Sequence, residues 1–215
     1  MKRARNTTQK ENRRDAIMEA ALDLLDTENF HDISMNMVAK AAGLAKGTLY
    51  LYFKTKEELF LAIHSEMFET FFDELNSELD KLEGGSTQQL AEFTGKFIAS
   101  RPMLMRLMTL SHTVLEKNTK EEAIVAFKSK TLANVAKTGA KLETLLPFIQ
   151  PGQGPFVVMS INALILGAHQ LTYPAPNVAE ITKKYPELSP FKLETEPFLI
   201  HLIQSYLYGL ESTPR

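Results

Sequence analysis

The side chains with the clearest chemical pattern lie in residues 46–56, a stretch that contains glycine, hydroxyl, aromatic and basic residues and no acid. If the stretch is helical, Gly47, Thr48 and Leu51 share one outward face. Glycine permits close approach, a threonine hydroxyl hydrogen-bonds a base edge, and leucine contacts a thymine methyl group. This face predicts base reading in a groove of DNA; the alternative is an ordinary helical hairpin with surface tyrosines.

Basic and phenolic side chains surround that face. They suit phosphate contacts, which hold a protein on DNA without reading its sequence. Two further arginines lie inside the first predicted helix. The predicted DNA contacts are Arg13, Arg14, Ser34, Asn36, Lys46, Gly47, Thr48, Tyr50, Leu51, Tyr52, Lys54 and Lys56.

Catalytic motifs are absent from the sequence, which contains no G-x-S-x-G, no H-E-x-x-H, no dinucleotide fingerprint and no P-loop. Residues 84–87, Gly-Gly-Ser-Thr, resemble a phosphate cradle but lack the Walker lysine and a preceding strand, so they predict a helix end followed by a helix cap. His112 and Glu116 have a metal-binding spacing without a third ligand. The sequence predicts a protein that is not an enzyme and that has no metal and no cofactor.

The net charge of −2 hides an asymmetry along the chain. Residues 1–56 carry ten Lys and Arg against seven Asp and Glu, a net +3, and the remaining residues carry fourteen against nineteen, a net −5. A basic N-terminal region suits phosphate or minor-groove contacts. The chain has no cysteine for a disulfide or thiolate site, and its basic N-terminus lacks an apolar signal segment. We therefore expect a cytoplasmic protein.

Two short helices must position the contact face. Apolar residues at 35, 38, 39 and 42 form one face of a first helix, which Ser34 caps and Gly43 ends. A second helix spans about residues 45–53 and turns Leu49 and Phe53 toward the core. The pair outlines a helix-turn-helix, whose second helix enters the DNA major groove.

Residues 13–64 resemble the N-terminal domain of TetR-family transcriptional regulators. The matching residues are Ile17, Ala20, Ala21, Leu24, Val38, Ala39, Ala42, Gly43 and the run GTLYLYFKTKEEL at 47–59. The resemblance implies an all-α fold, with a three-helix DNA-binding head over residues 1–56 and a helical ligand-binding and dimerisation body over residues 57–215. It also implies a homodimeric repressor that leaves a palindromic operator when a small inducer binds. The alternative is an architectural or cell-division factor whose body docks a protein partner.

Apolar periodicity predicts further helices. The first helix of the chain is predicted at about residues 8–28. The helices after the helix-turn-helix are predicted at about residues 55–82, 86–100, 102–116, 119–146, 155–173, 179–184 and 195–210. Capping boxes that begin at Thr8, Thr55, Ser86 and Thr119 mark four of the starts. Segment 155–173 is nearly apolar enough to cross a membrane, but polar residues interrupt it. We therefore expect a helix buried on most sides and no membrane partner.

The body contains the residues predicted to bind the inducer and the second subunit. Methionine lines adaptable apolar sites and is also an ordinary core filler, so both interpretations stay open. The inducer site, for a lipophilic or aromatic molecule, comprises Phe68, Phe72, Met105, Met108 and His112. The resemblance places the dimer interface on the last two long helices, through Ile161, Ile165, His169, Leu199, Ile203 and Tyr206.

Overall fold

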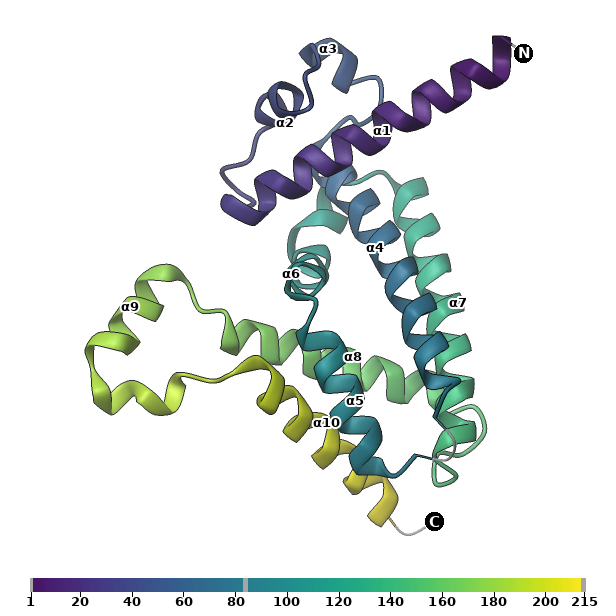
Figure 1. The fold of residues 1–215 in the computed structure, drawn as a ribbon, viewed down its shortest axis with the longest axis vertical. Coiled ribbons are helices and arrows are strands. Elements are labelled where there is room, and N and C mark those ends of the chain that lie inside the picture. Colours follow the sequence, from purple (N-terminus) through teal and green to yellow (C-terminus); the bar gives the residue numbers. More distant parts are fainter. Residues whose placement is uncertain (1, 83–84, 214–215) are drawn as a thin grey trace. The chain divides into compact units, whose positions relative to one another are not determined.

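The computed structural model of the chain describes residues 2–82 and 85–213, and every regular element in these ranges is helical (Figure 1). The α-helices are α1 (Lys2–Thr27), α2 (Met35–Ala41), α3 (Lys46–Leu49), α4 (Lys56–Leu79), α5 (Thr87–Ala99), α6 (Pro102–Leu110), α7 (Glu121–Leu145), α8 (Gly154–Thr172), α9 (Pro176–Lys184) and α10 (Thr195–Ser212). A π-helical turn η1 (Ser111–Leu115) and two 3₁₀ segments, η2 (Glu116–Asn118) and η3 (Pro186–Phe191), complete the list. The predicted all-α fold class is confirmed.

The chain forms two compact units. Unit 1 comprises Met1–Met67 and Leu110–Lys128, and unit 2 comprises Phe68–Thr109 and Ser129–Arg215. Helices α4 and α7 contribute residues to both units. Unit 1 therefore contains more than the predicted head, because it also includes the first part of α4 and the segment around η1 and η2.

Unit 1 is built around the apolar face of α1. Ile17, Ala21 and Leu25 lie at i, i+4 and i+8 and are completely buried. Helix α1 packs against α2, which in turn packs against α3. Phe30, in the loop before α2, contacts Phe60 of α4 edge to face, with ring centroids 5.3 Å apart. These contacts give the short helix pair a fixed support.

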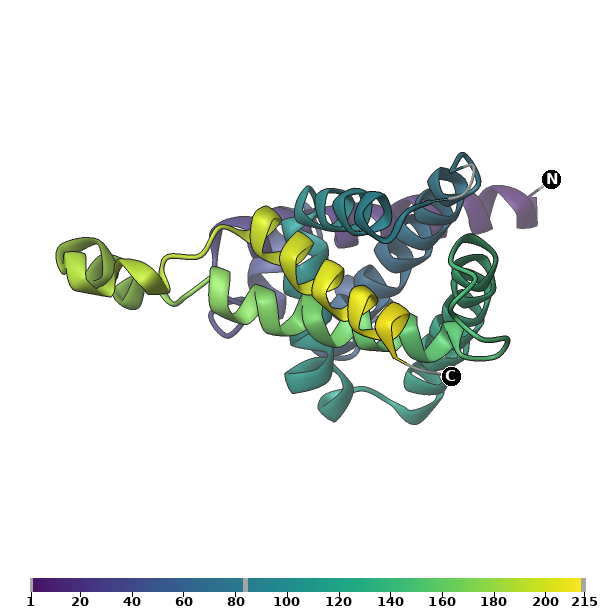
Figure 2. The same cartoon turned by 90° about the horizontal axis from the view of Figure 1, so that it is seen from below.

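Unit 2 has a core formed by α5, α8 and α10. Helix α10 packs along α5 and also against α8 (Figure 2). The approach to α5 is close, since a Cβ atom on Gly95 would lie 3.0 Å from the backbone nitrogen of Ile200. Leu199, Ile203 and Leu207 repeat every four residues along α10 and are completely buried. One face of α10 is therefore part of this unit's own core.

Some of the predicted helix ends differ from the structure. Helix α1 begins at Lys2, so Thr8 lies inside it and the predicted capping box there is wrong. Helix α3 is only four residues long, because turns replace its predicted last residues. The predicted helix 102–116 leaves α-helical geometry at Ser111 and continues as η1. The sequence contains no Pro or Gly that marks this change.

Of the three capping boxes predicted after the helix-turn-helix, two mark a confirmed cap and one is wrong. The Ser86 hydroxyl and the Gln89 side chain form the reciprocal bonds of a capping box at α5. The Thr55 hydroxyl accepts the Glu58 N–H at 3.0 Å, at the start of α4. Thr119 does not cap α7, because its hydroxyl donates to the Leu115 carbonyl at 2.7 Å and the next residue takes the cap position. The Gly84 of the possible phosphate cradle lies outside the described residues.

Candidate functional site

The helix-turn-helix of unit 1 is held by local contacts that the sequence predicts. The Ser34 hydroxyl accepts the Met37 N–H at 3.3 Å and caps α2. Gly43 ends the helix at φ +65°, a conformation that glycine adopts without a Cβ penalty. The chain then turns, and the Leu44 N–H donates to the Ala39 carbonyl at 2.8 Å. This turn sets the direction of α3.

The predicted contact face of α3 is open to solvent. Leu49, the last residue of α3, is completely buried, and Phe53 shortly after the helix is also buried. The side of this segment opposite these two residues therefore faces outward. On that side Leu51 is 74% exposed, and nothing lies within 4 Å of a Cβ atom built on Gly47. An isolated leucine and a bare glycine on a small outward face suit contact with a thymine methyl group and a nearby backbone.

The cationic side chains beside this face differ in their exposure and in the groups that they bind. Arg13 and Lys46 are exposed. Lys54 is also exposed, and its ammonium group donates to the Tyr50 carbonyl at 2.6 Å. Arg14 forms an ion pair with Glu66 and places its guanidinium group 5.5 Å from the Phe53 ring centroid. Arg14 is therefore engaged within unit 1, and its predicted phosphate contact would need it to leave this carboxylate.

Lys56 has an internal position that the sequence does not indicate. Its ammonium group donates to the carbonyls of Phe30, Ile33 and His31, at 2.7, 2.9 and 3.3 Å. It also lies 4.4 Å from the centroid of the Phe30 ring. The geometry favours a positioning role, in which Lys56 fixes the loop before α2, over the predicted phosphate contact.

All twelve predicted DNA contacts belong to unit 1. Their exposure falls into two groups. Ser34, Asn36, Lys46, Gly47, Leu51, Lys54 and Arg13 are exposed, and Arg14, Thr48, Tyr50, Tyr52 and Lys56 are half-buried.

The predicted inducer residues are mostly buried. Phe68 and Phe72 of α4 lie edge to face with ring centroids 4.7 Å apart, and Met105 and Met108 of α6 are buried in the same unit. His112 belongs to unit 1 and is exposed, with Nδ1 4.0 Å from a Glu116 oxygen. No group of three His, Cys, Asp or Glu side chains suited to a metal occurs among the described residues. Inducer binding by these five residues stays a prediction.

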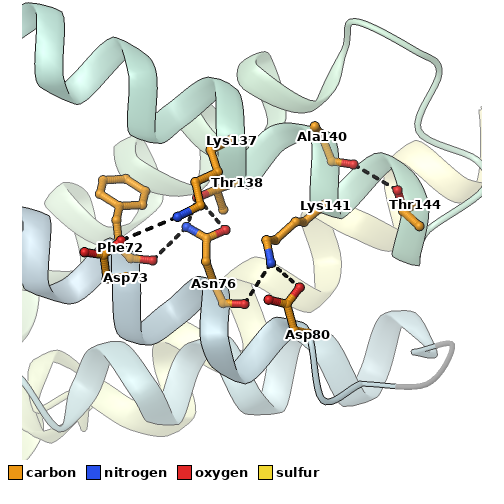
Figure 3. A network of polar contacts seen from close by, with 9 residues as sticks. All are labelled: Phe72, Asp73, Asn76, Asp80, Lys137, Thr138, Ala140, Lys141 and Thr144. Atoms are coloured by element: carbon orange, nitrogen blue, oxygen red, sulfur yellow. Dashed lines mark hydrogen bonds and ion pairs between the residues drawn. The ribbon is translucent and has the colours of Figure 1, made fainter.

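A polar network joins α4 and α7 inside unit 2 (Figure 3). The Asn76 amide donates to the Phe72 carbonyl at 2.7 Å and to the Thr138 hydroxyl at 3.0 Å, and both polar side chains are buried. Lys141 pairs with Asp80 and donates to the Asn76 carbonyl at 3.1 Å. Because buried polar pairs are satisfied in only one alignment, this network favours a single register of the two helices.

A surface groove lies beside this network. It has a volume of about 400 Å³ and is lined by Leu79, Asp80, Leu82, Ala140, Lys141, Thr144 and Leu145. Its size falls in the range of small-molecule sites. The sequence analysis did not identify these residues, because the two lining segments are about sixty positions apart and neither carries a motif.

Most of the predicted dimer residues are covered by their own chain, and their place in a dimer interface stays a prediction. Ile161, Ile165, Leu199 and Ile203 are buried by their own chain. His169 is buried 4.7 Å from the Tyr173 ring, and burial, with Arg106 nearby, lowers the pKa of His169. Tyr206 is half-buried, and its hydroxyl group is buried. Side chains already covered in one subunit offer little surface to a second.

The opposite face of α8 is apolar and uncovered. Phe156, Met159, Ala163, Gly167 and Leu171 lie within one arc of the helix, and all five are exposed. Of the described helices, α8 is the one long and apolar enough to cross a bilayer, with about a third of it buried. The predicted burial on most sides is therefore wrong, because only one face packs against unit 2. The periodicity did not separate the two faces, since both are apolar.

Comparison with known families covers nearly the whole chain. Residues 17–63 match the family described as bacterial regulatory proteins, tetR family. Residues 65–214 match the family described as tetracyclin repressor-like, C-terminal domain. The first match contains the helix-turn-helix, and the second contains the whole of unit 2 except its last residue.

Individual relatives agree with these matches. The fatty acid metabolism regulator protein of Bacillus subtilis is 32% identical over 63 residues, which is 29% of this chain and 32% of the relative. The matched stretch thus spans about a third of that relative. A TetR-family transcriptional regulator from Mesorhizobium loti has a similar structure, with a TM-score of 0.59, 21% identity and coverage of 93% and 96% of the two chains.

A Thermus thermophilus FadR, a TetR-family repressor whose structure contains lauroyl-CoA, has a TM-score of 0.57 at 17% identity, over 94% and 96% of the two chains. At these identities the two structural matches show a shared fold only.

Proposed function

The chain belongs to the TetR family of transcriptional regulators, and we propose that it is a repressor that binds a palindromic operator as a homodimer and leaves it when a lipophilic inducer binds. The family consists of regulators and not of enzymes. Under this proposal the protein works in the cytoplasm on chromosomal DNA.

The exposed face of α3 carries the DNA part of the proposal. Leu51 is the most exposed large apolar side chain of the described residues, and it lies in the turn directly after α3, the short helix that a helix-turn-helix presents to DNA. Thr48 and Gly47 lie beside it, and Lys46 and Lys54 flank it. We assign base contacts to Thr48 and Leu51 and phosphate contacts to the two lysines.

The outer face of α8 supports the homodimer. This face presents Phe156 at 71% exposure and Met159 at 50%, with Ala163 and Gly167 between them and Leu171. Small residues within an apolar face let a second helix approach closely, and large exposed apolar patches mark interaction sites. We place the main subunit contact on this face, in place of the inward residues that the sequence indicated.

Two observations support a lipophilic inducer. Five phenylalanines of α4 and α5 form a chain of ring contacts in unit 2, from Phe68 through Phe72, Phe71 and Phe97 to Phe93. A structurally similar relative contains lauroyl-CoA. We propose a long-chain acyl thioester as the inducer class. Its alkyl chain suits the apolar surroundings of these rings, and its polar head group would lie outside them.

The DNA part is tested by selection on a randomised half-site. Wild type should recover a palindrome, and Thr48→Ala and Leu51→Ala should each weaken binding to it by about 1–3 kcal/mol and relax one or two positions. Leu132→Ala, an equally exposed change on α7, is the matched control and should leave the motif unchanged. Recovery of the same motif and affinity by both α3 variants would refute base reading by this face.

The inducer part is tested on the selected operator. Lauroyl-CoA should release the wild-type protein from DNA at concentrations where coenzyme A alone has no effect. No release by acyl thioesters of any chain length would refute the inducer class and leave the DNA result intact. Binding sites scattered over a chromosome without any ligand response would instead favour the architectural role.

A further inference from the structure

The surface groove beside the polar network, which we name the α4–α7 groove, has a lining suited to a ligand with charged and apolar parts. It has a volume of about 400 Å³ and lies where the two helices end, at Leu79 and Leu145. Four of its seven lining residues are leucine or alanine, and the other three are Asp80, Lys141 and Thr144. The volume is at the low end for small-molecule sites, so the groove favours a compact ligand.

Lys141 supplies a cation at a fixed position in this lining. Its ammonium group pairs with Asp80 and donates to the Asn76 carbonyl at 3.1 Å (Figure 3). Asn76 is itself fixed, because its side chain is buried and donates to the Thr138 hydroxyl at 3.0 Å. The Lys141 side chain is only 22% exposed, so its ammonium group keeps its position and still requires an anion when Asp80 turns away.

Asp80 is the member of the ion pair that can turn away. Its side chain is 65% exposed, and it follows Leu79, the last residue of α4. An ion pair with so exposed a partner contributes little stability, so opening it costs little. The opened pair presents an ammonium group and a carboxylate group next to each other in the groove.

The charges next to this pair in the sequence have contacts of their own. Lys81 pairs with Glu78 at 2.6 Å. Glu143 accepts the N–H groups of Gly152 and Gly154, at 2.9 and 2.7 Å. Lys141 and Asp80, the two charged residues of the lining, are therefore the charges that a ligand in the groove meets.

Two adjacent charges of opposite sign favour a ligand that carries both signs. A carboxylate alone would pair with Lys141 and lie beside the displaced Asp80, which has the same charge. An ammonium group alone would pair with Asp80 and lie beside Lys141, again a like charge. A zwitterion pairs with both groups at once. The Thr144 hydroxyl donates to the Ala140 carbonyl at 3.1 Å, so its oxygen is left to accept a bond from the ligand's ammonium group.

The rest of the lining suits an apolar side chain on the ligand. Leu79 is buried, and Leu82 and Leu145 are half-buried. Ala140 is exposed, and its small side chain leaves space that a larger one would fill. Such a surface stabilises a branched or aromatic group by removing it from water.

We propose that the α4–α7 groove binds an α-amino acid with an apolar side chain. Lys141 binds the carboxylate, Asp80 binds the ammonium group, and the leucines contact the side chain. The ligand replaces the direct ion pair and bridges α4 to α7. None of the five predicted inducer residues lines this groove, and Phe72 precedes Leu79 by seven positions, about 10 Å along the helix. The amino-acid site is therefore distinct from the inducer site and independent of the proposed operator.

Calorimetric titration of the full-length protein tests the site, with L-leucine as the probe. Two analogues of the same skeleton each lack one charge: 4-methylpentanoate lacks the ammonium group, and 3-methylbutylamine lacks the carboxylate. Leucine should bind with a dissociation constant at least about tenfold below that of either analogue. Leucine that does not bind up to its solubility limit, or that binds no better than one analogue, would overturn the proposal.

Three variants place the ligand in the groove. Ala140→Leu fills the groove at an exposed helical position without changing either charge, so the protein should fold and bind leucine at least about tenfold more weakly. Ala133→Leu, also exposed on α7 and seven positions earlier, is the matched control and should bind like wild type. Asp80→Asn should bind leucine more weakly and 4-methylpentanoate more tightly than wild type, because the like charge is gone. Wild-type leucine affinity in Ala140→Leu would put the ligand elsewhere and overturn the site.

A labelling measurement locates the ligand directly. The chain has no cysteine, so Thr144→Cys introduces a single thiol into the lining and keeps Lys141 and Asp80. Saturating leucine should slow the reaction of this thiol with a maleimide, while Ala133→Cys should react at one rate with or without leucine. Unchanged labelling of Thr144→Cys, at a leucine concentration that saturates the calorimetric signal, would also overturn the site.

Discussion

Lys56 either positions the loop before α2 or contacts a DNA phosphate, and the substitution Lys56→Met distinguishes these two roles. Methionine keeps the apolar stem near Phe30 and removes three donated hydrogen bonds, at 2.7, 2.9 and 3.3 Å. A bond to a charged group contributes about 1.5–3 kcal/mol, but the three share one ammonium group at a partly exposed position, where water replaces much of the loss. We expect a total loss of about 2 kcal/mol. For a chain of this length that lowers the melting temperature by about 4–8 °C.

The assay combines thermal melting with the salt dependence of operator binding. Each phosphate contact that is lost lowers the slope of log affinity against log salt by about 0.9, or about 1.8 for a dimer with two heads. Lys56→Met should lower the melting temperature and keep the wild-type slope. Lys54→Met is the matched control, because Lys54 is exposed and bonds only locally to Tyr50. It should lower the slope by about 1.8 and leave the melting temperature within about 2 °C of wild type.

Binding must be measured at least about 20 °C below the lower melting temperature, so that the head is folded in both variants. A Lys56→Met protein that melts like wild type and loses about 1.8 in slope would refute the positioning role. It would restore the phosphate contact that the sequence indicates.

Three further outcomes are expected. Ile203→Glu should unfold the protein and not merely dissociate it, because this residue is completely buried in its own subunit; circular dichroism showing a folded monomer would contradict this. Gly139→Ala should lower the melting temperature, since its Cβ atom would lie 2.5 Å from the Pro155 nitrogen, whereas Gly209→Ala, with open space around it, should not. Burial, with His112 and Lys128 nearby, lowers the pKa of His64 to about 3, so below pH 6.5 the unfolded chain binds a proton that the folded chain does not. Denaturant titration should therefore show His64 contributing a fall of about 2 kcal/mol in the free energy of unfolding from pH 7 to pH 5. His64→Leu should remove that contribution, and the part of the fall that comes from the lowered pKa of His169 should remain.

The sequence determined the features that depend on neighbouring residues. Ser34 caps α2, Gly43 ends it in a left-handed conformation, and Ser86 with Gln89 caps α5, as predicted. Each of these depends on a side chain and a backbone group at most three positions apart. The outward position of Leu51 also follows from local geometry, because Leu49 and Phe53 must be buried.

The sequence was less informative where one side chain satisfies more than one role. A lysine after a recognition helix suits a phosphate, and it equally suits backbone carbonyls. The carbonyls that Lys56 binds come from a loop more than twenty positions earlier, so only the folded chain decides between the two. The Arg14 ion pair with Glu66 likewise joins side chains 52 positions apart, so only the folded chain shows it.

Tertiary structure alone decided which face of each late helix is covered. Helix α8 is apolar on both sides, so its periodicity does not tell an inward face from an outward one. Packing against its own chain buries Ile161 and Ile165 and leaves Phe156 and Met159 in solvent. The physical reason is that hydrophobic burial has no direction of its own. The apolar face that packs against the rest of the subunit becomes core, and the other apolar face stays exposed.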